Sequence, residues 1–313
     1  MEVDFCVNFA FLFAPASRLS KGLTFLVIHY NINIMIIKKV ELAPALKWVG
    51  GKRQLLDVFQ PLFPKDFSTY CEPFLGGGAV LFHLRPQVAI VNDANEELMN
   101  VYRVIKTQLN RLLEELKSYE NTSEFYYAIR DIDRDPSKYK KLSQVKRAAR
   151  ILYLNKTCFN GLYRVNNAGE FNVPYGKYKN PNIVNEIGLT AIHNYFNQAD
   201  IKMESTDFSK CLLDLPETAF VYFDPPYDPV STTSNFTGYA KGGFPKEEQE
   251  RLCQVCNSLD KRGIRFMLSN SATPFIRELY SNFNITIVKA KRAINSVGTK
   301  RGEVDEVVIR NYE

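Results

Sequence analysis

The fold is decided by one stretch of sequence, Ala219-Phe220-Val221-Tyr222-Phe223-Asp224-Pro225-Pro226-Tyr227. It opens with an uninterrupted apolar run, which is typical of a buried strand. The two prolines end that strand, because proline cannot donate a backbone hydrogen bond to a sheet. We therefore expect Asp224 and Tyr227 at the carboxyl end of a strand, held in rigid backbone, where open α/β sheets bind their ligands.

These side chains suit a planar base that carries an amine. Asp224 and the carbonyl of Pro225 can accept hydrogen bonds from an exocyclic NH2 group, and the ring of Tyr227 can stack on the base. The alternative is a strand that runs into an ordinary tight turn, with Tyr227 as a surface aromatic. A motif this short does not separate the two interpretations, so the rest of the chain has to.

The composition fits a globular protein with a polyanionic partner. The chain has 313 residues, of which 45% are hydrophobic, enough for the core of one or two domains. The net charge of +6 and the pI of about 8.8 are mildly basic, which is compatible with nucleic acid. Basic residues cluster in two places: Lys138, Lys140, Lys141, Lys146, Arg147 and Arg150, and then Lys289, Lys291, Arg292, Lys300 and Arg301. Taken alone, such clusters more often form solvated helix faces.

The cysteines are scattered and show no disulfide framework. Cys253 and Cys256 form a CxxC pair, but no second ligand pair at zinc spacing accompanies them. We expect both residues to belong to a helix and to pack against the core, and no metal site is predicted. The pattern fits a reducing cytoplasm.

Residues 1–45 differ from the rest of the chain and are interpreted as an atypical leader. The apolar stretch 5–13 is short and has acidic rather than basic flanks, which is a poor match to a signal peptide. The stretch 23–37 is interrupted by polar residues and does not predict a membrane span. Our hypothesis is that Met35 is the natural start.

Two glycine-containing segments come next. In Leu46-Lys47-Trp48-Val49-Gly50-Gly51-Lys52 the glycines permit close backbone approach, and a helix is expected from Arg53. A helix start with an interfacial Trp48 is the alternative interpretation. Tyr70-Cys71-Glu72-Pro73-Phe74-Leu75-Gly76-Gly77-Gly78 indicates a strand that leads into a glycine-rich turn, with a helix beginning over 79–84. This is the pattern of the first βα turn of a nucleotide-binding sheet, although it matches neither the dinucleotide fingerprint nor the P-loop.

Acidic residues lie next to two predicted strands, Asp93 at the end of one and Asp207 just before the strand that ends at Asp224. A strand over 88–91 ends at Asn92-Asp93, and an acidic residue in that place commonly holds ribose hydroxyls. Asp93 could equally cap the helix that begins near Glu96. Ser205-Thr206-Asp207-Phe208 offers a carboxylate and an aromatic ring that could hold an adenine by its polar edge and its face. Adenosine without a pyrophosphate is therefore a better prediction than a nicotinamide dinucleotide.

The middle of the chain predicts an insertion in the sheet domain. Helices are expected over 98–116, 123–132 and 145–154. The segment 155–176 carries Asn-Gly and Ala-Gly turns among aromatic residues, which predicts a hairpin-like loop. Arginine and asparagine in such a loop can read base edges in a major groove, while a solvated loop is the ordinary alternative.

The last third completes an α/β fold. A polar, lid-like segment is expected over 231–239, a helix over 249–259 and a strand over 264–268 that ends in Ser269-Asn270-Ser271. Two late strands, over 285–288 and 306–309, are joined by a basic loop. Alternating strands and helices predict a mostly parallel, Rossmann-like sheet covered on both faces.

With these blocks in place, the chain resembles the DNA adenine-N6 methyltransferases, specifically the group that methylates adenine in GATC. The resemblance runs from about Leu46 to Tyr312 and rests on several blocks in the same order: LKWVGGK, EPFLGGGAV, VND, NKTCFNGLYR with GEFNVPYGKY, DFS, DPPYDPVSTTSNFTGY, LSNS and EVVIRNY. One block would be a weak sign, whereas this many in order are specific.

The resemblance implies a set of roles. S-adenosylmethionine is expected at Trp48, Lys52, Glu72, Phe74, Gly76, Gly78, Asp93, Asp207, Phe208 and Asp224. Asp224, Pro225, Pro226 and Tyr227 are expected to hold a flipped adenine, and Lys47, Asn160, Leu162, Arg164 and Pro174 to contact double-stranded DNA. Arg164 matches an arginine that reads guanine in that family, and Leu162 and Pro174 match residues near a thymine.

The implied organisation is a catalytic domain of residues 46–97 and 201–313 and a target-recognition insertion of residues 98–200. Other classes stay open at this point: a catalytically inactive DNA-binding module, or a methyltransferase that acts on cytosine N4, RNA or a protein amide. A companion restriction endonuclease is compatible with the sequence, and so is an enzyme that works alone.

Overall fold

The computed structural model describes residues 42–230, 244–291 and 303–313. All of them belong to one compact unit, Val40–Glu313. The predictions for the leader up to residue 41, for the lid-like segment and for most of the late basic loop lie outside the described residues.

The described residues form a seven-stranded sheet in the order β3-β2-β1-β4-β5-β7-β6. Its strands are β1 (Tyr70–Glu72), β2 (Val88–Asn92), β3 (Asp200–Glu204), β4 (Phe220–Phe223), β5 (Arg265–Ser271), β6 (Asn284–Lys291) and β7 (Glu303–Arg310). The pairs β3-β2, β2-β1, β1-β4 and β4-β5 are parallel, and β7 runs antiparallel to both β5 and β6. The predicted mostly parallel sheet is confirmed.

Strand β4 is buried on both sides. Phe220 and Tyr222 belong to one hydrophobic cluster, and Val221 and Phe223 to the other. Successive side chains of a strand point to opposite faces, so the two clusters lie on the two faces of the sheet. A continuous apolar run is what a strand covered on both faces requires.

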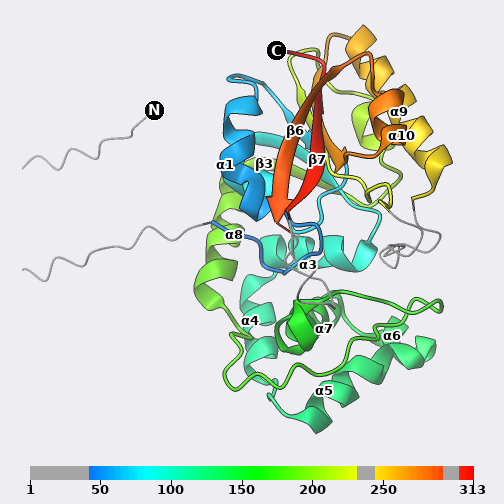
Figure 1. Cartoon of the computed structure of the whole chain (residues 1–313). Helices are drawn as coiled ribbons and strands as arrows, with labels where there is room; N and C mark the ends of the chain where they lie inside the picture. Colours follow the sequence, from blue (N-terminus) through cyan, green and yellow to red (C-terminus); the bar gives the residue numbers. More distant parts are fainter. Residues whose placement is uncertain (1–41, 231–243, 292–302) are drawn as a thin grey trace, which may run out of the picture. The chain divides into compact units, whose positions relative to one another are not determined.

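The described ranges contain ten α-helices: α1 (Leu56–Phe59), α2 (Ala79–Leu84), α3 (Glu96–Thr107), α4 (Leu109–Lys117), α5 (Ser123–Arg130), α6 (Pro136–Lys141), α7 (Gln144–Thr157), α8 (Glu186–Gln198), α9 (Lys246–Lys261) and α10 (Pro274–Leu279). Helices α9 and α10 bury their apolar residues in one cluster, and α2, α3, α7 and α8 in the other. Figure 1 shows α9 and α10 together on one side of the sheet, with α4 to α7 gathered beyond its end.

Two predictions need correction. The single helix expected over 98–116 is wrong: the chain leaves the helical conformation at Gln108, at φ −139° and ψ 36°, and splits into α3 and α4. No glycine or proline marks that break. The basic cluster of 138–150 is not one solvated face either. Its lysines are exposed, whereas Arg150 is only 2% exposed and Arg147 pairs with Glu97.

The packing predicted for Cys253 and Cys256 is confirmed. Cys253 and Cys256 face the core from α9 as free, buried thiols. In the described part of the chain no group of three or more His, Cys, Asp or Glu side chains is placed to hold a metal ion. No helix within the described ranges is both long and apolar enough to cross a membrane.

Candidate active site

The carboxyl ends of β1 and β4 bring the two main sequence motifs to one edge of the sheet. The strands are parallel neighbours, with Tyr70 opposite Phe220 and Cys71 opposite Val221. The glycine turn after Glu72 and the segment that begins at Asp224 therefore leave the sheet side by side. A shared site for a cofactor and a base requires this juxtaposition.

Asp224 meets a buried lysine. Lys52 Nζ lies 2.6 Å from Asp224 Oδ1, donates to the carbonyl of Gly50 at 2.6 Å and lies 4.6 Å from the centroid of the Tyr227 ring. Burial raises the pKa of the Asp224 carboxyl, and the charge and hydrogen bond of Lys52 oppose that rise. The site thus holds a carboxylate and an aromatic face close together, both already in contact with a cationic donor.

A serine on β5 supports the same carboxylate. Ser269 Oγ donates to Asp224 Oδ1 at 3.3 Å and shares a 2.9 Å hydrogen bond with the Tyr222 hydroxyl. Both residues are fully buried. The sequence located Ser269 at a strand end but gave no indication that it contacts Asp224.

The backbone after the prolines is held by two buried amides. Gln249 Nε2 donates to the carbonyl of Pro226 at 2.9 Å, and Asn270 Nδ2 donates to Gln249 Oε1 at 3.1 Å. Asn270 Oδ1 accepts from the N–H of Asp228 at 3.0 Å. Neither amide was predicted, because the contacts join residues 21 to 42 positions apart.

The phenol of Tyr227 is also fixed. Its hydroxyl donates to Glu306 Oε2 on β7 at 2.8 Å. Because that hydroxyl is engaged with the sheet, the ring face is the part of Tyr227 that can serve a planar ligand.

The glycine turn is joined to Trp48 and Asp93. Gly76 adopts φ 49°, and a Cβ placed there would come within 2.9 Å of Trp48 Cδ1. The N–H of Gly76 donates to Asp93 Oδ2 at 2.9 Å. Asp93 Oδ1 accepts from the N–H of Asn95 at 2.9 Å, and burial raises the pKa of the Asp93 carboxyl. Only a glycine at position 76 lets the indole approach this closely.

The alternative role considered for Asp93 is not observed. The cap of α3 is Asn95, whose side chain accepts from the N–H of Leu98. Asp93 instead ties the glycine turn to the end of β2.

Asn92 connects the glycine turn to the segment that carries Asp207. Nothing in the local sequence indicated this role. Its buried amide donates to the carbonyls of Pro73 at 3.0 Å and Thr206 at 3.2 Å, and its Oδ1 accepts from the N–H of Thr206 at 2.8 Å. The glycine turn and the Asp207 segment are thereby held together.

Asp207 and Phe208 lie against a single arginine. Arg251 binds both carboxylate oxygens of Asp207, at 3.0 and 2.7 Å, and lies 4.0 Å from the ring centroid of Phe208. The arginine holds the pKa of Asp207 well below its usual range. The Phe208 ring packs against Phe74 at 5.2 Å. Phe74 and Phe208 thus form an aromatic pair next to a carboxylate.

Glu72 ends β1 as a buried carboxyl. It is 2% exposed, and its Oε2 accepts from the Tyr70 hydroxyl at 2.9 Å. Burial raises its pKa well above the ordinary value.

The residues predicted to contact DNA fall into two neighbouring groups. The buried amide of Asn155 accepts from the N–H of Lys47 at 2.8 Å and donates to the carbonyls of Lys47 and Gly161 at 2.9 and 3.0 Å. Lys47 therefore lies beside the Asn160-Gly161 turn, whose residues have φ 57° and 64°. Asn155 was not predicted, since its role emerges only when distant segments meet.

The same turn contacts the far end of the loop. The N–H of Phe159 donates to the carbonyl of Pro174 at 2.9 Å, and the Phe159 side chain is 52% exposed. Leu162 is half-buried. Lys47, Asn160 and Pro174 are thus gathered around one turn.

Arg164 belongs to the second group, on the predicted hairpin. Val165 and Phe171 form an antiparallel bridge, and the N–H of Asn172 donates to the carbonyl of Arg164 at 3.0 Å. The Arg164 side chain donates to Asn172 Oδ1 at 2.8 Å. The hairpin-like loop is confirmed.

One aromatic stack joins this loop to the glycine turn. The rings of Trp48 and Tyr163 are 4.8 Å apart and inclined by 25°. Tyr163 lies between Leu162 and Arg164 in sequence, so Trp48 is in direct contact with the loop that carries the predicted DNA-contacting residues.

The sheet, the glycine turn after β1 and the Asp-Pro-Pro-Tyr segment after β4 are consistent with a methyltransferase fold. A family model for D12 class N6 adenine-specific DNA methyltransferases matches residues 48–294, and the chain belongs to this family. The chain is therefore an adenine-specific DNA methyltransferase, as the resemblance implied.

Individual relatives agree with that assignment. The chain is 46% identical over 283 residues to "Type II methyltransferase M1.LlaDCHI" of Lactococcus lactis subsp. cremoris, covering 90% of this chain and 99% of that protein. It is 45% identical to "Type II methyltransferase M.MjaIII" of Methanocaldococcus jannaschii, covering 87% and 100%. It is 35% identical to "DNA adenine methylase" of Escherichia coli (strain K12), covering 84% and 93%.

The family implies S-adenosylmethionine as the methyl donor, and the site fits such a group. The positive φ of Gly76 and the indole against it leave a side-chain-free backbone beside Asp93. The Phe74–Phe208 pair supplies aromatic faces. A nucleoside needs a hydroxyl acceptor and an apolar face, and both lie on this edge of the sheet.

Proposed function

We propose that the chain transfers a methyl group to N6 of a flipped adenine within GATC in double-stranded DNA. The observation that carries the proposal is the environment of Lys52 Nζ, a nitrogen donor 2.6 Å from Asp224 and 4.6 Å from the Tyr227 ring centroid. A base stacked on the Tyr227 ring would place its exocyclic amine where it needs the same two partners, the Asp224 carboxylate and the aromatic face. The family membership supplies the reaction, and the proposal adds the residues and the sequence.

The methyl donor would be held by Trp48, Lys52, the Glu72–Gly78 turn, Asp93, Asp207 and Phe208. S-adenosylmethionine supplies an activated methyl group on a sulfonium, so the protein mainly has to position the acceptor. Asp207 would stay paired with Arg251, which also lies against the Phe208 ring. Asp207 would thereby help to hold the Phe208 ring in position for the cofactor. No metal enters the proposed reaction.

The acceptor would be held by Asp224, Pro225, Pro226 and Tyr227. Extruding an adenine from the duplex costs a few kcal/mol, and stacking on Tyr227 returns about 1–3 kcal/mol of it. Asp224 and the carbonyl of Pro225 accept hydrogen bonds from the amine, which makes its nitrogen more electron-rich and orients its lone pair. Asp224 does not need to remove the proton before attack, because its task is orientation and charge stabilisation.

The target sequence would be read by Lys47, Asn160, Leu162, Arg164 and Pro174. Arginine and asparagine have the donor geometry for purine edges in the major groove, and apolar groups suit a thymine methyl. The Asn155 contacts and the hairpin hydrogen bonds support this assignment because they gather these residues from three segments. We propose residues 98–200 as the target-recognition insertion and residues 46–97 and 201–313 as the catalytic domain.

The biological setting is proposed from the names of relatives. Two of them are named type II methyltransferases, which favours a restriction-modification context with a companion endonuclease. Another is named a DNA adenine methylase. Membership of an adenine-specific DNA family argues against cytosine N4, RNA or a protein amide as the main acceptor. The intact Asp224–Tyr227 segment argues against an inactive module.

The decisive experiment is to methylate a plasmid with the purified protein and S-adenosylmethionine. The plasmid is then digested with GATC-cutting nucleases that differ in their sensitivity to adenine methylation. Protection against the sensitive nuclease, with full cutting by the insensitive one, is expected. Methyl incorporation at other sites with GATC left unprotected would reject the sequence assignment while keeping the reaction.

A further inference from the structure

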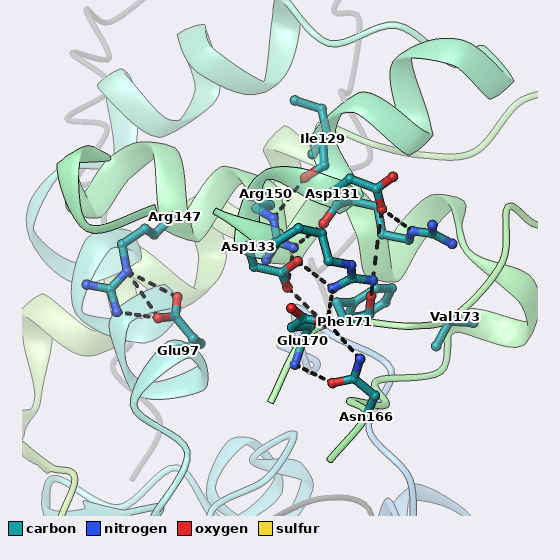
Figure 2. A network of polar contacts seen from close by, with 12 residues as sticks. Glu97, Ile129, Asp131, Asp133, Arg147, Arg150, Asn166, Glu170, Phe171 and Val173 are labelled. Carbon is teal, nitrogen blue, oxygen red and sulfur yellow. Dashed lines mark hydrogen bonds and ion pairs between the residues drawn. The ribbon is translucent and has the colours of Figure 1, made fainter. Parts of the chain in front are cut away.

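Two side chains hold the backbone of the hairpin of residues 164–172 at Phe171. Asp133 Oδ2 accepts from the N–H of Phe171 at 2.8 Å, and Arg134 Nη2 donates to the carbonyl of Phe171 at 2.6 Å. Both side chains come from the short helical turn Asp131–Arg134. Figure 2 shows Asp133 close to Phe171, with Arg150 behind it.

Asp133 is itself held in place by two arginines. Arg150 Nη2 lies 2.7 Å from Asp133 Oδ2, and Arg134 Nη1 lies 2.7 Å from Asp133 Oδ1. The Arg150 side chain is 3% exposed, and it also donates to the carbonyls of Ile129 and Arg130. We call Asp133, Arg134 and Arg150 the hairpin clamp.

A cavity lies beside the clamp. Its volume is about 230 Å³, and it separates the hairpin from α6 and α7, with Tyr139 and Ile151 on the helix side and Gly169 and Phe171 on the hairpin side. Backbone pairing within the hairpin consists of the Val165–Phe171 bridge and the hydrogen bonds next to it. The buried Phe171 side chain anchors this strand in the core, and the clamp fixes the orientation of its backbone.

Phe171, the residue that the clamp holds, is next in sequence to the hydrogen-bond partner of Arg164. Asn172 comes directly after Phe171, and it is bound to Arg164 through backbone and side chain at 3.0 and 2.8 Å. A shift of Phe171 would move Asn172 and reorient the guanidinium. Bidentate recognition of a base tolerates little such movement.

We propose that Asp133 and Arg134 are positioning residues for target-sequence recognition, which fix the hairpin so that Arg164 meets its base edge. The inference rests on the proposed role of that hairpin in reading DNA. A buried ion pair is often no more stabilising than apolar side chains of the same size. The clamp is therefore better explained by orientation than by stability.

The test compares Asp133→Asn and Arg134→Ala with Glu97→Gln. Glu97 pairs with Arg147 and borders the same cavity, so its substitution disturbs a neighbouring ion pair without touching Phe171. Single-turnover methylation is measured on a GATC duplex and on duplexes with one altered base pair, together with the dissociation constant for S-adenosylhomocysteine.

We expect Asp133→Asn and Arg134→Ala each to lower the ratio of the methylation rate on GATC to the rate on an altered site by about tenfold. The affinity for S-adenosylhomocysteine should stay within about twofold of the wild type. Glu97→Gln is expected to keep the wild-type ratio. An unchanged ratio in the clamp variants, or a parallel loss of cofactor affinity and rate on every duplex, overturns the inference. If Asp133→Asn does not fold, Arg134→Ala decides alone, because the Arg134 side chain is 31% exposed. Failure of the proposed function would show in the wild type, as no preference for GATC.

Discussion

Lys52 Nζ and Asp224 Oδ1 are 2.6 Å apart, at the point where the sequence places the acceptor for an exocyclic amine. The ammonium also lies over the Tyr227 ring. A base that enters this site has to share Asp224 with Lys52 or displace Lys52. The ionised carboxylate accepts the hydrogen bond of the amine more strongly than the protonated carboxyl does. The charge on Lys52 therefore controls the pH range in which the site can work.

The first prediction concerns that pH range. Burial raises the pKa of Asp224, and Lys52 lowers it, so the methylation rate should fall as the pH drops through the folded-state pKa. In Lys52→Met the opposing contribution is lost, the pKa rises further, and the acid limb of the rate moves to higher pH. Single-turnover rates at saturating DNA and cofactor, measured from mildly acidic to mildly basic pH, check this. An acid limb that stays in place or moves down would contradict the assignment of Asp224 as the titrating group.

The second prediction concerns Asp224 itself. Asp224→Asn keeps an oxygen for Lys52 but removes the negative charge that the reacting amine needs. We expect the rate to drop by about 100-fold or more, with an unchanged circular dichroism spectrum and a lower Tm, because Lys52 loses its counter-charge. Asp57→Asn, at an exposed position, is the control. Wild-type turnover in Asp224→Asn would remove this residue from the reaction.

Local patterns predicted most of this site. The apolar run before Asp224 indicated β4, the glycines indicated the turn after β1, and Asn160-Gly161 indicated a tight turn, which has two positive φ values. In each case a few consecutive residues carry a backbone requirement that other residue types meet poorly. Such features can be recognised without the fold.

The contacts that were missed join residues far apart in sequence. Arg251 reaches Asp207 across 44 positions, and Asn155 reaches Lys47 across 108. A polar side chain in a helix gives no local sign of the partner that it will meet. The break at Gln108 is similar, since no glycine or proline signals it and the packing of α3 and α4 against α7 favours it.

The third prediction separates the two parts of Tyr227. Its hydroxyl is bound to Glu306, so Tyr227→Phe should keep the stacking face and lose less than about tenfold in rate. Tyr227→Leu should lose about 1–3 kcal/mol of stacking, seen as weaker retention of the flipped base. Duplexes with 2-aminopurine at the target position report that step by fluorescence. Equal losses in the two variants would mean that the hydroxyl, not the ring, serves the base.

The fourth prediction concerns Gly76. Alanine there has to adopt φ near 49°, which costs about 1–2 kcal/mol, and its Cβ would come within 2.9 Å of Trp48. We expect Gly76→Ala to lower the Tm and to weaken S-adenosylhomocysteine binding. Gly169→Ala is the matched control, because φ is 86° there and no atom lies within 4 Å of the added Cβ. Gly169→Ala should lower the Tm through its backbone strain but leave the affinity for S-adenosylhomocysteine unchanged. If both substitutions changed that affinity equally, the contact between Trp48 and the glycine turn would have no role in cofactor binding.

The last prediction concerns Phe159, an aromatic side chain that is 52% exposed beside Asn160 and the carbonyl of Pro174. An aromatic ring exposed on a DNA-reading turn can stack on bases and occupy the space that an extruded adenine leaves. Phe159→Ala should therefore slow base extrusion by about 10- to 100-fold, in line with the stacking energy of one base, and leave cofactor affinity unchanged. Ile187→Ala on α8, at a site that is 70% exposed, controls for the loss of an exposed apolar group. If Phe159→Ala extrudes 2-aminopurine at the wild-type rate, the turn carries sequence contacts only and the duplex is opened elsewhere.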